Sequence, residues 1–281
     1  MTHTNRKSKG GKKWDKKKWK KRECECVWEM ARERNEWNER NERIGRSERV
    51  RKKSGCKYRL VIFDMDDTLL NSRGRSAVAY EWAYRAFEKT LSRYGLSLSR
   101  REIDTLFLAP LHAENEEGVR KFCRRFNLNV EDFWRNRERD VIEAKKEAMR
   151  SGEITLCEGA YDVVKDLSED FLLAVVSDSQ QECVEFALEH FKLKPFFAVW
   201  HGRSSDLRAL SLRKPNPFHL NLVLDELKVP RENAILVDDS PLGILAAKRA
   251  GMDAVLVSRT KVECEPKFWV KDIRQLRDIL L

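Results

Sequence analysis

The chain has 281 residues, 41% of them hydrophobic, which is enough for one full-sized globular domain together with a smaller one. It lacks the roughly 18 consecutive apolar residues that a membrane-spanning helix needs, and its seven cysteines are odd in number and scattered. These features argue against a membrane span and a disulfide framework. They predict a soluble, cytoplasmic protein with reduced thiols.

The positive charge is concentrated at the start of the chain. Residues 1–56 hold 20 Lys and Arg against 9 Asp and Glu, whereas the whole chain has a formal charge of +10. Because this segment is rich in charged and Asn residues and poor in apolar ones, we predict a disordered basic extension. Three roles are open for it: a dispensable extension, a weak nucleic-acid contact through clustered Lys and Arg with interleaved Trp, or an arm that docks on a membrane surface or a protein.

The composition changes at Tyr58, where the apolar run Tyr58–Phe63 predicts a buried strand that ends at acidic residues. Residues 76–150 have apolar side chains at helical spacing and predict about four helices. Strands and helices then alternate, with strands expected at 171–177, 196–200, 233–238 and 253–257, and helices at 159–168, 181–191, 217–226, 241–250 and 270–280. This alternation predicts an α/β fold with a parallel sheet and helices on both faces.

Polar residues follow three of the expected strands, and the carboxyl ends of parallel strands meet at one edge of a sheet. These residues are Asp64 and Asp66, then Ser177 and Asp178, then Asp238 and Asp239. Grouped carboxylates repel one another unless a cation is present, and hard oxygen ligands select Mg²⁺. Lys214 adds a positive charge and Ser177 a hydroxyl group, both suited to a phosphate. The set favours phosphoryl transfer.

Four motifs carry a resemblance to a known family. In order along the chain they are Asp64-Met65-Asp66-Asp67-Thr68-Leu69, Ser177-Asp178-Ser179, Lys214-Pro215-Asn216-Pro217, and Val237-Asp238-Asp239-Ser240-Pro241 continuing to Gly251. They resemble, in order and spacing, the motifs of the haloacid dehalogenase (HAD) superfamily. Asp66 is the second aspartate that dehalogenases lack, so the chain is similar to the phosphatase and phosphomutase branch, which includes phosphoglycolate phosphatase and β-phosphoglucomutase. Asp67 stands where many relatives have glycine.

The resemblance implies a role for each motif residue. Asp64 is the nucleophile, and Asp66 protonates the leaving group and then activates water. Ser177, Asp178 and Lys214 hold the phosphate. The Mg²⁺ ligands are Asp64, the backbone carbonyl of Asp66 and Asp239, with Asp238 assisting. An isolated Asp-x-Asp after a strand is more often a turn or a helix cap, and it is the four motifs together that favour catalysis.

The resemblance also implies the domain organisation: a Rossmann-like three-layer core at residues 57–73 and 157–281, with an inserted helical cap at residues 74–156. Caps of this kind exclude water and select the substrate. Arg75, His112, Glu114 and Asn115 are candidate selectors, although the favoured interpretation of these four is that they are solvated loop residues. Aromatic residues of the insertion, among them Trp82, Phe87, Phe122, Phe126 and Trp134, are expected to form its core.

We therefore expect a Mg²⁺-dependent phosphomonoester hydrolase that acts on a small phosphorylated metabolite through an aspartyl-phosphate. A phosphomutase similar to β-phosphoglucomutase is the enzymatic alternative. The alternative of another class is a non-catalytic regulatory protein that contacts nucleic acid through residues 1–56.

Overall fold

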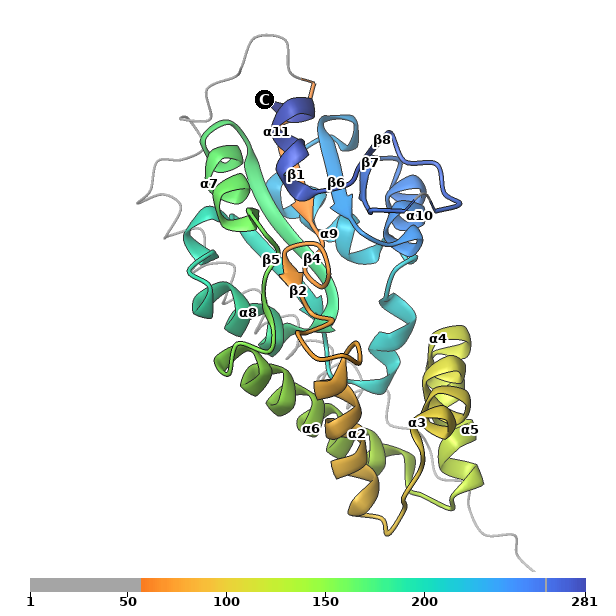
Figure 1. The fold of residues 1–281 in the computed structure, drawn as a ribbon. Helices are drawn as coiled ribbons and strands as arrows, with labels where there is room; N and C mark the ends of the chain where they lie inside the picture. Colours follow the sequence, from red (N-terminus) through yellow and green to blue (C-terminus); the bar gives the residue numbers. More distant parts are fainter. Residues whose placement is uncertain (1–56, 261) are drawn as a thin grey trace, which may run out of the picture. The chain divides into compact units, whose positions relative to one another are not determined.

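A parallel sheet of six strands forms the centre of the α/β part of the described chain (Figure 1). The computed structural model describes residues 57–260 and 262–281, so the predictions for residues 1–56 lie outside the described residues. The strand order is β5-β4-β1-β6-β7-β8, and every adjacent pair is parallel. The strands are β1 (Leu60–Phe63), β4 (Leu172–Gln180), β5 (Val199–Arg203), β6 (Ala234–Asp238), β7 (Asp253–Val257) and β8 (Phe268–Val270).

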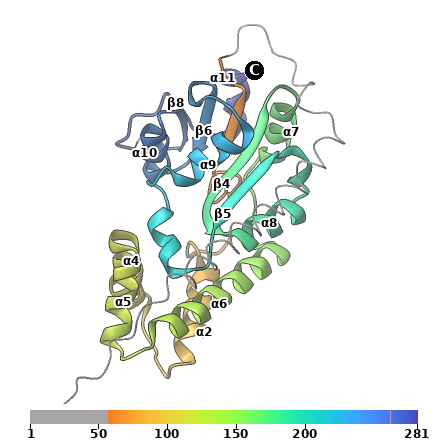
Figure 2. The same ribbon diagram turned by 180° about the vertical axis from the view of Figure 1, so that it is seen from behind.

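The central strand β1 is buried on both faces, and its residues alternate between two hydrophobic clusters. Leu60 and Ile62 pack with α9 (Phe218–Leu227) and α10 (Pro241–Ala250). Val61 and Phe63 pack in the cluster that includes residues of α7 (Ala160–Asp170), α8 (Gln181–His190) and α11 (Leu276–Leu280). The period of two along a strand therefore produces three layers, with the sheet between two groups of helices (Figure 2). The α/β Rossmann-like prediction is confirmed.

A helical insertion separates β1 from β4. We give this name to residues 81–150, which comprise α2 (Glu81–Ser92), α3 (Arg100–Ile103), the π-helical segment η2 (Asp104–Leu108), α4 (Ala109–Glu114), α5 (Glu116–Arg125) and α6 (Val130–Arg150). Two short antiparallel strands, β2 (Leu70–Asn71) and β3 (Thr155–Leu156), join the points where the chain enters and leaves the insertion. The insertion has its own aromatic core, in which the ring centroids of Phe87 and Phe107 lie 4.4 Å apart. Phe87, Phe122, Phe126 and Trp134 pack in this core, as expected, whereas Trp82 packs in the cluster that includes Val61 and Phe63.

Short 3₁₀ helices connect several elements: Lys194–Phe196, Leu207–Leu212, Arg231–Asn233 and Ile273–Gln275. Two of them mark differences from the sequence prediction. Because Lys194–Phe196 forms a 3₁₀ turn, β5 begins at Val199 and not at the expected residue 196. The helix expected at 270–280 is wrong in its first half, because Phe268–Val270 pairs with β7 and an Asp272–Gln275 capping box starts a new turn. Tertiary pairing overrides local periodicity at this sheet edge.

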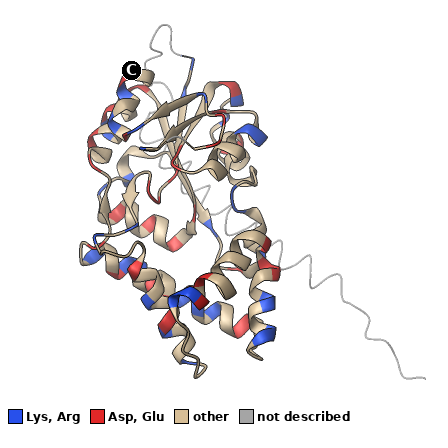
Figure 3. Cartoon of the chain, turned by 45° about the vertical axis from the view of Figure 1, so that its right-hand side comes forward, with Lys and Arg blue, Asp and Glu red and all other residues tan. Residues whose placement is uncertain are grey.

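Charges of both signs are interspersed over the described elements (Figure 3), in keeping with 36 Lys and Arg against 37 Asp and Glu in residues 57–281. Among the described helices, none combines the length and apolar character needed to cross a membrane.

Candidate active site

The predicted motif residues meet at the carboxyl ends of β1, β4 and β6. Asp64 follows β1 directly, and its backbone N–H donates to Val237 O of β6 at 2.8 Å. Ser177 and Asp178 belong to β4, and Asp238 is the last residue of β6. Because β1 lies between β4 and β6, Asp64 has the second motif, on β4, on one side and the fourth motif, at the end of β6, on the other. The sheet topology thus brings together residues that are more than 170 positions apart.

Lys214 lies at the centre of this group. Its Nζ donates to Asp64 Oδ1 at 2.6 Å, to Asp238 Oδ2 at 2.8 Å and to the carbonyl of Val176 at 2.9 Å. Burial opposes the charge of Lys214, but Asp238 and Asp64 outweigh it and raise its pKa well above the ordinary value. Lys214 is therefore a buried cation with every proton of its ammonium group directed at an oxygen.

Asp64 is buried, with 8% of its surface exposed. Burial raises its pKa, Lys214 lowers it, and the negative charges of Asp238 and Asp66 raise it further, so that the net shift is strongly upward. The pKa of Asp239 rises to about 7 because of burial and the nearby charges of Asp238 and Asp67. Two carboxylates thus lie in an environment whose negative charge is incompletely compensated, which is the electrostatic condition that a bound cation relieves.

This arrangement fits the donor set implied for Mg²⁺. In the described part of the chain, no three His, Cys, Asp or Glu side chains group as metal ligands. The implied set needs only two carboxylates, those of Asp64 and Asp239, together with the backbone carbonyl of Asp66. Hard oxygen donors of this kind suit Mg²⁺, which keeps several of its water ligands. Asp238 is bound to Lys214 instead.

Asp66 projects toward the helical insertion. Its carboxylate accepts hydrogen bonds from Ser72 Oγ, from Lys145 Nζ and, at 2.6 Å, from Ser179 Oγ. Burial favours its protonated form, but the charge of Lys145 and the three hydrogen bonds outweigh burial and hold the pKa of Asp66 below the ordinary value. Asp66 is therefore ionised at neutral pH in this arrangement. Lys145 belongs to α6, so a residue of the insertion contacts a residue of the first motif.

The backbone around the two other motif loops is fixed by local contacts. Ser177 is buried and its Oγ accepts from the N–H of Ser179 at 3.1 Å, while Asp178 Oδ1 accepts from the N–H of Lys214 at 3.0 Å. Burial raises the pKa of Asp178. Asp178 therefore positions the Lys214 loop through its side chain.

Asp67 and Gly243 have structural reasons for their identities. Asp67 has φ of 61°, in the left-handed region that favours glycine, and its carboxylate accepts hydrogen bonds from Arg73 and Tyr80. At Gly243, in the first turn of α10, an added Cβ would overlap the carboxylate of Asp238. The turn begins as the sequence predicts, with Ser240 as N-cap and Pro241 at the first helical position.

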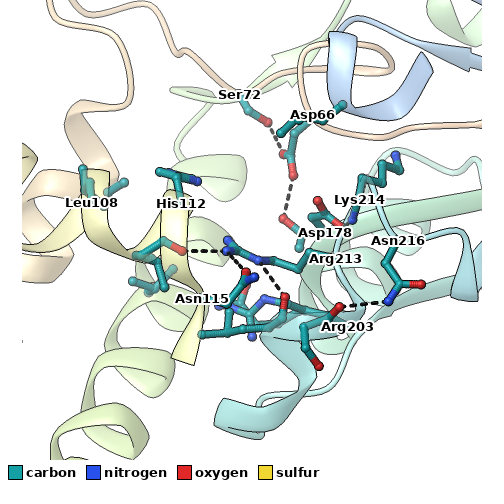
Figure 4. A pocket seen from close by; sticks show the side chains of 18 of the residues that line it. Asp66, Ser72, Leu108, His112, Asn115, Asp178, Arg203, Arg213, Lys214 and Asn216 are labelled. Carbon is teal, nitrogen blue, oxygen red and sulfur yellow. Dashed lines mark hydrogen bonds between the residues drawn. The ribbon is translucent and has the colours of Figure 1, made fainter. Parts of the chain in front are cut away.

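A cavity of about 880 Å³ opens beside these residues (Figure 4). It is lined by motif residues, among them Asp66, Asp178 and Lys214, and by residues of the insertion, among them Trp82, His112 and Asn115. This volume is within the range of small-molecule sites. Of the four candidate selectors, His112 and Asn115 line the cavity. Arg75 and Glu114 are absent from its lining, and Glu114 pairs with Lys121.

Several residues of the site were missed by the sequence analysis, notably Lys145 and Glu138. Both lie on the buried stripe of α6, which runs Trp134, Glu138, Val141, Lys145 and Ala148. Charged residues at core positions of an amphipathic helix are a signal of buried pairing. The signal was present in the sequence, but the partners, Asp66 and Arg203, come from distant segments.

Comparison with known proteins agrees with the fold and with the family resemblance. Residues 61–257 match the haloacid dehalogenase-like hydrolase family, and the chain belongs to that family. Within it, the chain is similar to phosphatases.

Individual relatives are distant. A pyrophosphatase, PpaX of Listeria welshimeri, is 28% identical over 69% of this chain and 80% of its own length. The structure of CbbY from Rhodobacter sphaeroides in complex with phosphate has a TM-score of 0.61 at 24% identity, covering 78% of this chain and 96% of that one. YfnB from Bacillus subtilis, bound to magnesium, has a TM-score of 0.59 at 18% identity, covering 80% and 99%. The two structures agree with this chain in fold.

Proposed function

We propose that the protein is a Mg²⁺-dependent phosphomonoester hydrolase that acts on a small phosphorylated metabolite through an aspartyl-phosphate. The observation that carries the proposal is the group formed by Asp64, Lys214, Asp66 and Ser177 at one edge of the sheet. It combines a carboxylate nucleophile, a buried cation 2.6 Å from it, an ionised second carboxylate and a hydroxyl donor.

The proposed chemistry has two steps. Asp66 is ionised in the arrangement described, so it first accepts a proton from the monoanionic phosphate group of the substrate. A carboxylate oxygen of Asp64 then forms a bond to phosphorus, the bond from phosphorus to the ester oxygen breaks, and the leaving oxygen takes this proton from Asp66. Asp66 then accepts a proton from a water molecule, which attacks phosphorus and releases Asp64. Lys214 and Ser177 would bind the phosphoryl oxygens, with Lys214 exchanging its hydrogen bond to Asp64 for one to a phosphoryl oxygen. They would stabilise the charge that is spread over these oxygens in the transition state.

Asp64, the carbonyl of Asp66 and Asp239 would hold Mg²⁺, and Asp238 would hold Lys214. The ion, when bound, neutralises negative charge on the phosphoryl group and on the carboxylates. The contact of Lys145 with Asp66 supports a cap role for residues 74–156, in which α6 closes over the site and excludes water.

Hydrolysis of p-nitrophenyl phosphate tests this proposal. Activity should require Mg²⁺, disappear in EDTA and fall by about 10³-fold or more in Asp64→Asn, because the amide is not a nucleophile toward phosphorus. Glu263→Gln, on the loop between β7 and β8, is a matched control for the loss of one carboxylate. Metal-independent turnover, or an Asp64→Asn variant as active as the control, would contradict the mechanism.

Pyrophosphate hydrolysis is a second candidate activity, since relatives of this chain are named as pyrophosphatases. The same assay with inorganic pyrophosphate, scored by release of phosphate, compares the two. A kcat/KM for pyrophosphate above that for a panel of phosphomonoesters would favour this candidate.

A further inference from the structure

Four arginines line the cavity, and the proposed chemistry uses none of them. Arg249 of α10 is exposed and donates to the carbonyl of Pro215 at 2.9 Å, whereas the other three are less exposed. Arg137 comes from α6. Arg203 is the last residue of β5, and Arg213 immediately precedes Lys214 (Figure 4). They come from three separate segments of the chain. Their positive charge is only partly balanced by the described residues.

Arg137 and Arg203 share a single carboxylate. Arg203 Nη1 lies 2.7 Å from Glu138 Oε2, and Arg137 Nη1 pairs with Glu138 Oε1. Only 3% of the Glu138 side chain, 6% of that of Arg203 and 14% of that of Arg137 are exposed. Two buried guanidinium groups against one carboxylate leave one positive charge in excess. The Nε of Arg137 is buried without a hydrogen-bond partner.

Arg213 has neutral partners. Its Nη2 donates to the carbonyl of Leu111 at 2.9 Å and to Asn115 Oδ1 at 2.7 Å, and both acceptors belong to the insertion. Asp178 contributes a favourable charge, but no ion pair joins Arg213 to a carboxylate among the residues that the structure describes. Burial lowers the pKa of Arg213 and of Arg137, the direction expected for cations that are desolvated beyond what their partners compensate.

A neighbouring histidine responds to the same charges. The pKa of His112 is lowered by burial, then by Arg213 and Arg137. His112 therefore stays neutral and adds no competing positive charge to the cavity. It can still donate or accept a hydrogen bond.

The arginines are separate from the proposed phosphoryl position. Lys214 directs its Nζ to Asp64 and Asp238, whereas the side chain of the preceding Arg213 extends to the insertion residues Leu111 and Asn115. Figure 4 shows Arg213 directed toward Asn115 and His112, away from Lys214. A group bound by Arg213 would therefore not be the phosphoryl group held by Lys214.

We propose that Arg213, Arg203 and Arg137 form a second anion subsite, and that the substrate carries a second oxyanion, a carboxylate or a further phosphate, in addition to the phosphoryl group that is transferred. Guanidinium groups bind such planar or tetrahedral oxyanions through paired hydrogen bonds. An anion in the subsite supplies the charge that Glu138 alone does not. This inference rests on the proposed function for the identity of the transferred group.

Matched substrate pairs test the subsite in the wild-type protein. Ethyl phosphate against 2-phosphoglycolate isolates a carboxylate, and ribose 5-phosphate against ribose 1,5-bisphosphate isolates a second phosphate. In at least one pair, we expect the compound with the second oxyanion to exceed its partner in kcat/KM by about 10-fold or more, as a charge-assisted hydrogen bond would give. The pair that discriminates identifies the second group. Equal kcat/KM within both pairs would overturn the proposal.

A variant pair assigns the effect to the subsite. Arg213→Gln should lower kcat/KM about 10-fold for the favoured substrate, mainly through KM, and change that for p-nitrophenyl phosphate less than about twofold. Arg213→Lys, which keeps the charge but lacks the paired N–H donors of the guanidinium group, should lower kcat/KM by less. Arg208→Gln, at an exposed position of the same segment, is the control. Equal losses for both substrates would show a merely structural role and overturn the assignment.

Binding separates this inference from the proposed function. Calorimetric titration of the Asp64→Asn protein with 2-phosphoglycolate and with ribose 1,5-bisphosphate should show, for at least one of the two, weaker binding when Arg213→Gln is added. If the wild-type protein hydrolyses no phosphate ester but this difference is measured, the proposed function fails and the subsite stands. If hydrolysis is observed and Arg213→Gln leaves binding unchanged, the subsite fails and the function stands.

Discussion

The contact between Lys145 and Asp66 provides the sharpest test of the site, because it links the helical insertion to a motif residue. Lys145→Met keeps the length and much of the apolar contact of the side chain but removes its charge. Asp66 would lose its charged hydrogen-bond donor and keep those from Ser72 and Ser179. The side chain of Lys145 is 3% exposed and that of Asp66 30% exposed, so solvent compensates part of the loss.

The size of the effect follows from these exposures. Hydrogen bonds to charged groups contribute about 1.5 to 3 kcal/mol, and partial exposure of Asp66 places the expected loss of unfolding free energy at about 1 to 2 kcal/mol. For a domain of this size that corresponds to a fall in Tm of about 3 to 6 °C. Hydrolysis of p-nitrophenyl phosphate should fall by about 10-fold or more, because Asp66 loses the contact that orients it.

The loss of stability in Lys145→Met should depend on pH. The pKa of Asp66 is lowered in the folded protein, so its stabilising contact is fully present above the unfolded pKa and is lost as pH falls through the folded pKa. The Tm difference between wild type and Lys145→Met, measured in EDTA, should therefore be constant above about pH 5 and shrink below about pH 4. Lys146→Met, on the adjacent position of α6, is the control. A difference that does not change with pH, or an equal loss in the control, would refute the reasoning.

Two further predictions concern the fourth motif. In Gly243→Ala the added methyl group would overlap the carboxylate of Asp238, which is a partner of Lys214, and displace it. Although Ala ordinarily favours a helix, we expect chemical denaturation to show a loss of about 1 to 3 kcal/mol in unfolding free energy, and we expect a lower kcat. A variant as stable as wild type would contradict the overlap. The pKa of Asp239 is raised to about 7, so the metal-free protein should lose stability as pH rises through 7. Mg²⁺ should raise Tm more at pH 8 than at pH 6, which thermal scans with Mg²⁺ and with EDTA check. An equal increase in Tm at both pH values would count against Asp239 as a ligand.

The sequence by itself determined the class of the fold and the position of the motifs. The alternation of Leu60, Val61, Ile62 and Phe63 between two clusters follows from the period of a strand, and the polar residue after each apolar run marks the edge where a parallel sheet collects its ligands. Ser240, Pro241 and Gly251 likewise mark the ends of α10 through local capping chemistry. These features are local or nearly so, and therefore readable from short stretches of sequence.

Only the tertiary structure decided which charged side chains meet. Lys145 reaches Asp66 across 79 positions of sequence, and Glu138 reaches Arg203 across 65. Their presence on the buried stripe of α6 indicates that each needs a partner, but the partner depends on how the insertion packs against the ends of β1 and β5. Burial makes an unpaired charge costly, and only the packing of distant segments shows which cations lack a matching anion. Arg213 is such a cation, and its neighbours in sequence give no indication of it.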